Sequence, residues 1–285
     1  MVTQIPEVIH DAKEMRSLTD RLKREGKTVG CVPTMGALHE GHLSLARESV
    51  AATDVSVATI FVNPTQFAPG EDLSTYPRQL EQDLKLLAEV GVDYVFCPEV
   101  ETMYPEGCST SVTAPKISKK LEGEFRPTHF SGVATIVLKL FNIVGPTVAF
   151  FGQKDFQQVA VIQQMVRDLN LPTEIRACPI VRAEDGLALS SRNAYLTPEE
   201  RQIALTINRT LTHIQKQIEG GQRDSFEVVT EMRQMLIDGG VTSIDYVAVV
   251  DPKTLDSCDP IELPVALLIA VYVGKTRLID NAVVN

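Results

Sequence analysis

Two histidines near a glycine-rich turn are the first residues whose types and spacing fit a chemical role. His39 and His42 lie in the segment PTMGALHEGH, residues 33–42, and at a helix start a spacing of three places both rings on one face. Each imidazole can donate a hydrogen bond to a phosphate oxygen, whose charge would favour the protonated ring. Gly36 and Gly41 permit close backbone approach. A helix cap with two solvent-exposed histidines is the alternative interpretation.

Side-chain amides follow in a second segment, FVNPTQF, at residues 61–67. Asn63 and Gln66 can each donate and accept hydrogen bonds, which suits a ligand-binding loop. An Asn-Pro turn with ordinary polar residues would explain the same segment if it stood alone.

Two further segments carry basic side chains. In FGQKDFQQ, residues 151–158, Lys154 precedes a possible helix N-cap, Asp155, and Gln158 follows near the next helical turn. In GLALSSRN, residues 186–193, two serines precede Arg192, whose guanidinium suits a phosphate group. A solvent-exposed lysine and an interdomain turn are the alternatives.

The spacing of apolar residues predicts the elements that position these segments. Up to residue 182, strands are expected at residues 28–33, 55–62, 94–97, 147–151 and 174–178, and helices at 41–53, 80–90, 132–144 and 155–169. Apolar strands that alternate with helices are typical of a parallel sheet covered on both faces. Ligands of such sheets bind beyond the carboxyl ends of the strands, at the switch point. We therefore predict an α/β fold with a Rossmann-like domain over residues 1–182.

The pattern changes after residue 182. Thr197-Pro198 followed by two glutamates is typical of a helix start; helices are expected to residue 219 and over 225–237, and strands over 244–250 and 265–273. These elements predict a smaller α+β domain over residues 183–285. Three polar segments then follow parallel strands and the fourth lies at the domain junction. This convergence favours a nucleotide-using enzyme over a structural protein.

Composition excludes several other classes for this chain of 285 residues. A net charge of −10 disfavours a broad nucleic-acid interface, and the longest apolar run, residues 265–273, is far shorter than the ~20 residues of a membrane-spanning helix. The first residues lack the basic and apolar regions of a secretory signal. Five scattered cysteines without C-x-x-C spacing favour reduced thiols over a zinc site or disulfides. We therefore expect a cytoplasmic protein without nucleic-acid or membrane partners.

Seven motifs in order resemble the pantothenate synthetase family over nearly the whole chain. Besides the four segments above they are YPR at residues 76–78, HFSGV at 129–133 and RLIDN at 277–281. The resemblance implies a nucleotidyltransferase with an H-x-G-H signature, a Rossmann-like domain with a smaller C-terminal lid, and a homodimer. It also implies two steps, in which pantoate and MgATP form pantoyl-adenylate and β-alanine then displaces AMP.

The resemblance also implies roles for individual residues. Gln66 matches a contact to pantoate and β-alanine, Gln158 a contact to pantoate, and Val181 a backbone contact to adenine. The first ATP segment comprises Met35, Gly36, Ala37, Leu38, His39, Glu40, Gly41 and the catalytic histidine, His42. The other ATP contacts are Gly152, Gln153, Lys154 and Asp155, and a mobile phosphate-binding segment of Leu189, Ser190, Ser191 and Arg192. Gln153 replaces a common glutamate and Thr128 a common glycine, and neither change removes a proposed catalytic group.

The mechanism expected from these residues is positioning with charge neutralisation. The positive field would come from Mg²⁺ with four side chains, His39, His42, Lys154 and Arg192. No cluster of acids and histidines forms a metal cage, so Mg²⁺ should arrive with ATP, with Asp83 as a possible outer contact. Two alternatives stay open: a nucleotidyltransferase acting on another, phosphate-bearing co-substrate, and a non-catalytic nucleotide-binding regulator.

Overall fold

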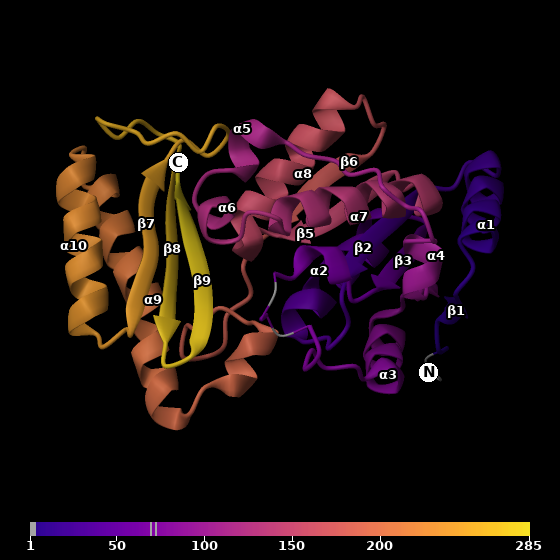
Figure 1. Ribbon diagram of the computed structural model, residues 1–285, viewed down its shortest axis with the longest axis horizontal. Coiled ribbons are helices and arrows are strands. Elements are labelled where there is room, and N and C mark those ends of the chain that lie inside the picture. Colours follow the sequence, from indigo (N-terminus) through magenta and orange to yellow (C-terminus); the bar gives the residue numbers. More distant parts are fainter. Residues whose placement is uncertain (1–3, 69, 72) are drawn as a thin grey trace.

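A six-stranded parallel sheet forms the first part of the molecule. The computed structural model describes residues 4–68, 70–71 and 73–285 (Figure 1). The strand order is β1-β4-β3-β2-β5-β6, and every pairing is parallel. The strands are β1 (Glu7–Ile9), β2 (Val29–Thr34), β3 (Val55–Ile60), β4 (Tyr94–Phe96), β5 (Val148–Gly152) and β6 (Glu174–Cys178).

Helices cover both faces of this sheet, as the apolar strands predicted. On one face α2 (Glu40–Ala52) and α3 (Leu80–Val90) pack on β3 and β4. On the other face lie α1 (Ala12–Arg24), α7 (His129–Val144) and α8 (Phe156–Asp168). Strand β5 shows the alternation, because Val148 and Phe150 pack with α2 while Ala149 and Phe151 join the core beneath α7.

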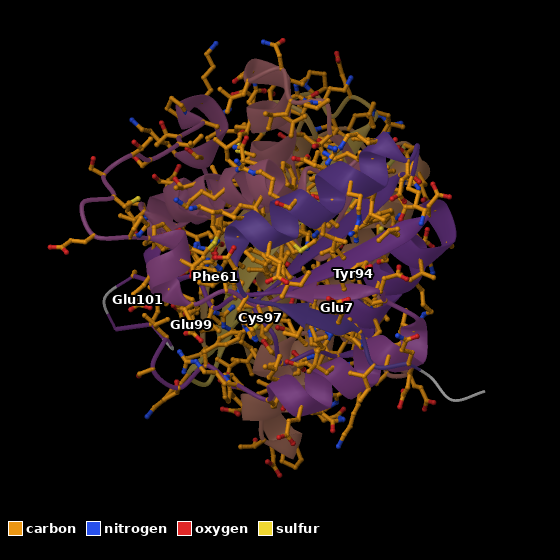
Figure 2. The ribbon with its side chains drawn as sticks, turned by 90° about the vertical axis from the view of Figure 1, so that its right-hand side faces the viewer. Glu7, Phe61, Tyr94, Cys97, Glu99 and Glu101 are labelled. Carbon is orange, nitrogen blue, oxygen red and sulfur yellow. The ribbon has the colours of Figure 1, made fainter. Side chains whose placement is uncertain are left out.

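Short helices occupy the connections. They are α4 (Val100–Met103), α5 (Pro115–Ser118), α6 (Glu122–Phe125) and the 3₁₀ turns η1 (Pro64–Gln66), η2 (Gln153–Asp155) and η3 (Ser191–Tyr195). Figure 2 views the β1–β4 edge of the sheet. Glu7 and Tyr94, paired at the amino ends of their strands, lie apart from Phe61 and Cys97, which follow β3 and β4 at the carboxyl ends.

The C-terminal part is an antiparallel sheet backed by two long helices (Figure 1). Its strands are β7 (Ser243–Val250), β8 (Val265–Val273) and β9 (Thr276–Val284), in that order, with α9 (Pro198–Glu219) and α10 (Ser225–Asp238) on one face. Alternate β8 residues such as Leu267 pack on these helices, whereas Leu268 joins the core of the parallel sheet. The two sheets therefore share apolar contacts, and the boundary between residues 182 and 183 stays a prediction.

Most predicted elements are present with ends shifted by one or two residues. Helix α9 begins as expected, because Thr197 Oγ1 accepts from Glu200 N and the Glu200 carboxylate accepts from Thr197 N. Helix α7 begins at His129, earlier than the predicted residue 132. Besides the short connecting helices, strands β1 and β9 and helix α1 were not predicted. Strand β1 has three residues, α1 is polar on most of its surface, and β9 buries Asp280 and Asn281, which resemble loop residues in the sequence.

Among the described residues, no helix has both the length and the apolar character needed to cross a membrane.

Candidate active site

A pocket opens where the order of the parallel strands reverses. From β2 the chain proceeds to β3 on one side, and β5 later pairs with β2 on the other side. The loops after β2 and β5 therefore diverge beyond the carboxyl ends of these strands, where α/β sheets bind ligands. Residues from both loops, η1, η3 and β9 line the pocket. The segments singled out in the sequence thus converge in space.

The two histidines of the first segment stack at the start of α2. His39 is the N-cap residue, and its ring centroid lies 4.1 Å from that of His42. His39 Nδ1 accepts from Gly41 N at 3.1 Å, and His42 Nδ1 accepts from His39 N at 3.4 Å. Because a backbone N–H only donates, each Nδ1 must lack a proton, so each neutral ring carries its proton on Nε2.

These rings are hydrogen-bond donors without charge in the protein alone. Burial, together with the neighbouring His39 and Lys154, lowers the pKa of His42 to about 3. Burial and Lys154 also lower the pKa of His39. In the protein alone, the fixed positive charge of the pocket therefore comes from Lys154 and Arg192, and protonation of the two imidazoles beside a phosphate stays a prediction.

Lys154 lies in the η2 turn after β5. Its ammonium is 3.5 Å from the Asp155 carboxylate. Burial acts to raise the pKa of Asp155, but Lys154 and Arg192 outweigh it and the pKa is lowered. Asp155 occupies the N-cap position of α8 without a side-chain capping bond. Strand β9 fixes the turn, because Asn281 Nδ2 donates to the carbonyls of Gln153 at 2.9 Å and Lys154 at 2.8 Å.

Gln66 ends the η1 turn after β3, and its amide has a defined orientation. Asn63 Nδ2 donates to Gln66 Oε1 at 3.1 Å, which leaves Gln66 Nε2 as the donor near Met35 Sδ. Helix α7 approaches this turn so closely that a Cβ on Gly132 would lie 2.4 Å from the Thr65 carbonyl oxygen. The glycine of the HFSGV motif therefore allows α7 to support the turn.

His129, in the first turn of α7, has the opposite tautomer. Its Nδ1 lies 2.9 Å from the Gln66 carbonyl oxygen, which only accepts, so Nδ1 carries the proton. Burial and Arg126 lower the pKa of His129 to about 4. Nε2 therefore presents a lone pair. Since His129 lines the pocket, it is suited to accept a hydrogen bond from a ligand.

The serine-arginine segment lines the pocket. Leu189 N donates to the Val181 carbonyl at 2.9 Å, which joins the two backbones, and Ser190 Oγ accepts from Arg192 N at 3.3 Å. Asn193 Nδ2 donates to the Ala188 carbonyl at 2.9 Å. These contacts form the η3 turn and place the segment beside the pocket.

A network of buried charges forms another wall and joins the two sheets. The Glu122 carboxylate accepts from Arg277 of β9 at 2.7 and 2.8 Å and from Arg126 at 3.3 Å. Burial acts to raise the pKa of Glu122, but Arg277 and Arg126 outweigh it and the pKa is lowered. Arg126 also donates to the Gln66 carbonyl at 3.3 Å. The network thus reaches the backbone of η1.

Most of the site residues predicted from the sequence line this pocket. They are Met35, His39, Gly41, His42, Gln66, Gly152, Lys154, Asp155, Gln158, Val181, Leu189, Ser190, Ser191 and Arg192. Five lie outside its lining: Gly36, Ala37, Leu38, Glu40 and Gln153. Ala37 and Leu38 are buried within the loop between β2 and α2. Glu40 is exposed and pairs with Arg47.

Several pocket residues received no role from sequence reasoning. His129, Arg277 and Asn281 belong to HFSGV and RLIDN, so the motifs marked their segments but not their contacts. Glu122 and Arg126 lie in none of the seven motifs.

Asp83, expected near Mg²⁺, is 1% exposed and accepts from backbone N–H groups of the loop between β2 and α2.

The described residues contain no group of three or more acidic, histidine or cysteine side chains placed to hold a metal ion.

Known proteins resemble this chain in both sequence and architecture. The family described as Pantoate-beta-alanine ligase matches residues 7–283. Pantothenate synthetase of Caldicellulosiruptor bescii is 52% identical over 278 residues, covering 98% of this chain and 99% of the relative. The crystal structure of the Thermus thermophilus enzyme has a TM-score of 0.92 at 42% identity, covering 97% and 98% of the two chains. A Francisella tularensis pantoate-beta-alanine ligase, complexed with beta-gamma ATP and beta-alanine, has a TM-score of 0.81 at 37% identity, covering 98% and 97%. Matches of this extent show that the chain belongs to the pantoate–β-alanine ligase family.

Proposed function

We propose that this protein joins pantoate to β-alanine at the expense of ATP, through a pantoyl-adenylate. The observation that carries the proposal is the convergence of phosphate-suited groups and acid-suited amides in one pocket. His39, His42, Lys154 and Arg192 lie with Gln66 and Gln158 in its lining. The pantothenate synthetases similar to this chain, and the Francisella tularensis ligase complexed with beta-gamma ATP and beta-alanine, support the same assignment.

In the first step, a pantoate carboxylate oxygen attacks the α-phosphorus of MgATP and pyrophosphate departs. Both reactants are anions, so the protein must hold them together and offset their charge. Lys154 and Arg192 supply positive charge, and the Nε2–H groups of His39 and His42 donate to phosphate oxygens. Mg²⁺ carried with ATP would add charge neutralisation on the phosphates. Gln66 Nε2 and Gln158 hold pantoate.

In the second step, the β-alanine amine attacks the carbonyl carbon of the adenylate and AMP departs. The β-alanine ammonium must first lose one proton to solvent to give the attacking amine, and the amine loses a second proton as the amide forms. His129 Nε2, a lone pair in the pocket wall, is suited to accept a hydrogen bond from the amine. The mixed anhydride is already activated, so the reaction needs no protein nucleophile. Cys31 is suited to no such role, because burial raises its pKa to about 12.

The finer expectations belong to the same proposal. Leu189 to Arg192 would close over bound ATP, Val181 would contact adenine through its backbone, and residues 183–285 would act as a lid. We also propose a cytoplasmic homodimer, in line with the reduced cysteines and the family resemblance. Light scattering on the purified protein would measure the assembly state directly.

Isotope exchange tests the proposed reaction. Labelled pyrophosphate should enter ATP when pantoate is present without β-alanine, and β-alanine should then release AMP. Exchange with a phosphate-bearing co-substrate but not with pantoate would assign a different nucleotidyltransferase reaction. ATP binding without exchange or AMP release would indicate a regulator that binds nucleotide without turnover. Pantothenate formation without exchange would point to a concerted reaction.

A further inference from the structure

The loop between β2 and α2 contains two consecutive residues in the left-handed region. Gly36 has φ +80° and Ala37 has φ +52°. Glycine adopts this conformation freely, but a residue with a Cβ is strained there. Ala37 precedes Leu38 and His39, so its backbone sets the direction in which α2 starts. Some contact must therefore hold Ala37 in place.

That contact is the carboxylate of Asp83. Its Oδ2 accepts from Ala37 N at 3.0 Å and its Oδ1 accepts from Leu38 N at 2.8 Å. Gln79 Nε2 also donates to Oδ1, at 3.4 Å. Asp83 lies in the first turn of α3 and is 1% exposed. Both oxygens are thus engaged away from solvent, which leaves little capacity for a metal ion.

Successive backbone N–H groups in a turn of this kind form a concave anion site. In this loop the anion is a side chain of the protein, since Asp83 occupies the N–H groups of Ala37 and Leu38. Phosphate oxygens must then find their donors further along, at the two histidines and the start of α2. Packing also joins this loop to α3, because Leu38 lies in the same apolar cluster as Leu87 of α3.

We propose that Asp83 is a positioning residue for adenylation, which holds the strained Gly36–Ala37 turn so that His39 and His42 point their Nε2–H groups at the ATP phosphates. The proposal rests on the proposed function. It assigns Asp83 to the protein backbone instead of to Mg²⁺.

Asp83→Asn is the first test, because it keeps the shape and replaces one acceptor oxygen with an NH₂ group. A lost buried partner of this kind corresponds to roughly a 5- to 150-fold effect. We expect a loss of that size in kcat for pantoate-dependent ATP–pyrophosphate exchange, with the KM for ATP changed by less than about threefold. Glu81→Gln is the matched control, since Glu81 is an exposed acid in the same helical turn. It should retain wild-type exchange.

Rescue by Ala37→Gly separates positioning from other roles. Glycine removes the strain at φ +52°, so this change should raise the exchange rate of Asp83→Asn several-fold more than it changes the wild-type rate. A metal contact would instead raise the Mg²⁺ concentration needed for half-maximal exchange and would not respond to Ala37→Gly. Absence of rescue, or a shifted Mg²⁺ requirement, would overturn the proposal.

Gly36→Ala reaches the same turn without altering the carboxylate. The added Cβ would lie 3.1 Å from Asp83 Oδ2 and 3.2 Å from Ile60 Cγ2. We expect the same loss in kcat with little change in the KM for ATP, and this variant carries the test if Asp83→Asn does not fold. Where both single variants fold, the double variant Gly36→Ala/Asp83→Asn should lose less kcat than the product of the two single losses. A loss equal to that product would contradict a shared turn. Failure of the wild type to exchange would reject the proposed function and not the role of Asp83.

Discussion

Three histidines in the pocket carry their protons on different nitrogens, and this difference defines what each can do. His39 and His42 accept backbone N–H groups at Nδ1 and therefore donate from Nε2, whereas His129 donates from Nδ1 and accepts at Nε2. Two donors suit phosphate oxygens, and one acceptor suits a substrate N–H or O–H group. The tautomers therefore give each proposed step its own groups: two donors for the phosphates in the first step and one acceptor for the amine in the second.

Removal of the His42 ring should affect adenylation most. A donor aimed at charge that shifts in the transition state contributes about 10²–10³ in rate, so His42→Ala should slow pantoyl-adenylate formation by that factor. Single-turnover measurement of each half-reaction checks this, with the exposed His213→Ala as control. If amide formation collapsed while adenylation stayed fast, His42 would belong to the second step.

Acid should destabilise the fold through the buried histidines. The pKa of His42 is lowered from 6.5 to about 3, so below pH 6.5 the unfolded chain binds a proton that the folded chain refuses. The contribution of the neutral His42 ring to the free energy of unfolding is therefore present above pH 6.5 and is lost as the pH falls toward 3. Between pH 6.5 and 4.5, His42 should account for a loss of about 2 kcal/mol.

Urea unfolding at the two pH values measures this loss. His42→Gln should reduce the difference in unfolding free energy between them. An unchanged difference in His42→Gln would mean that the ring titrates alike in both states.

At the scale of elements, loops after β2, β3 and β5 carry the chemistry, and each is held by a residue distant in the sequence. Asp83 of α3 holds the first loop, Arg126 and His129 hold η1, and Asn281 of β9 holds η2. The C-terminal sheet therefore contributes to the pocket, because it fixes the turn that carries Lys154.

Loss of the Asn281 amide should loosen that turn. Asn281→Ala leaves two partly buried carbonyls without their donor, and a fully buried group that loses its partner costs about 1–3 kcal/mol. We expect kcat/KM for ATP in the exchange reaction to fall by roughly 10- to 100-fold, chiefly because Lys154 is displaced. The control is Asn142→Ala, an exposed amide on α7. Wild-type kcat/KM in Asn281→Ala would show that the turn is held by other contacts.

On the scale of the whole molecule, the two sheets are joined by apolar contacts and by a buried ion network. Arg277 bridges Asp245 of its own sheet at 2.7 Å and Glu122 of the first part of the chain. Arg126 continues the network to Glu71 at 2.7 Å. Charges so little exposed are tolerated only when they are paired.

Removal of one partner should therefore be costly. Arg277→Met should lower the free energy of unfolding by about 3–5 kcal/mol, because Glu122 stays buried with less compensation. The double variant with Glu122→Gln should lose less than the sum of the single losses. Arg176→Met breaks the exposed pair with Glu174 and should cost below about 1 kcal/mol. Denaturant titration measures the four variants against the wild type, and equal losses for the exposed and buried pairs would contradict the role of burial.

The sequence alone determined the fold class, most elements and the segments that form the pocket. These follow from local patterns: apolar strands alternate with helices, and Thr197 begins α9 through bonds to its own first turn. The resemblance of the motifs gave the family. Strand β9 was not predicted, because the burial of Asp280 and Asn281 depends on partners elsewhere in the chain. Arg182 pairs with Asp280, and the η2 carbonyls accept from Asn281.

Only the tertiary structure decided the charge and orientation of the reactive groups. His39 and His42 resemble cations in the sequence, but burial and backbone donors make them neutral Nε2–H donors. Asp83 resembles a metal contact but bonds to two amides 45 and 46 residues away. The pKa of these rings depends on the burial that the fold supplies, whereas their Nδ1 bonds are local to the start of α2. Asp83 and its partners, far apart in the chain, meet only when it has folded.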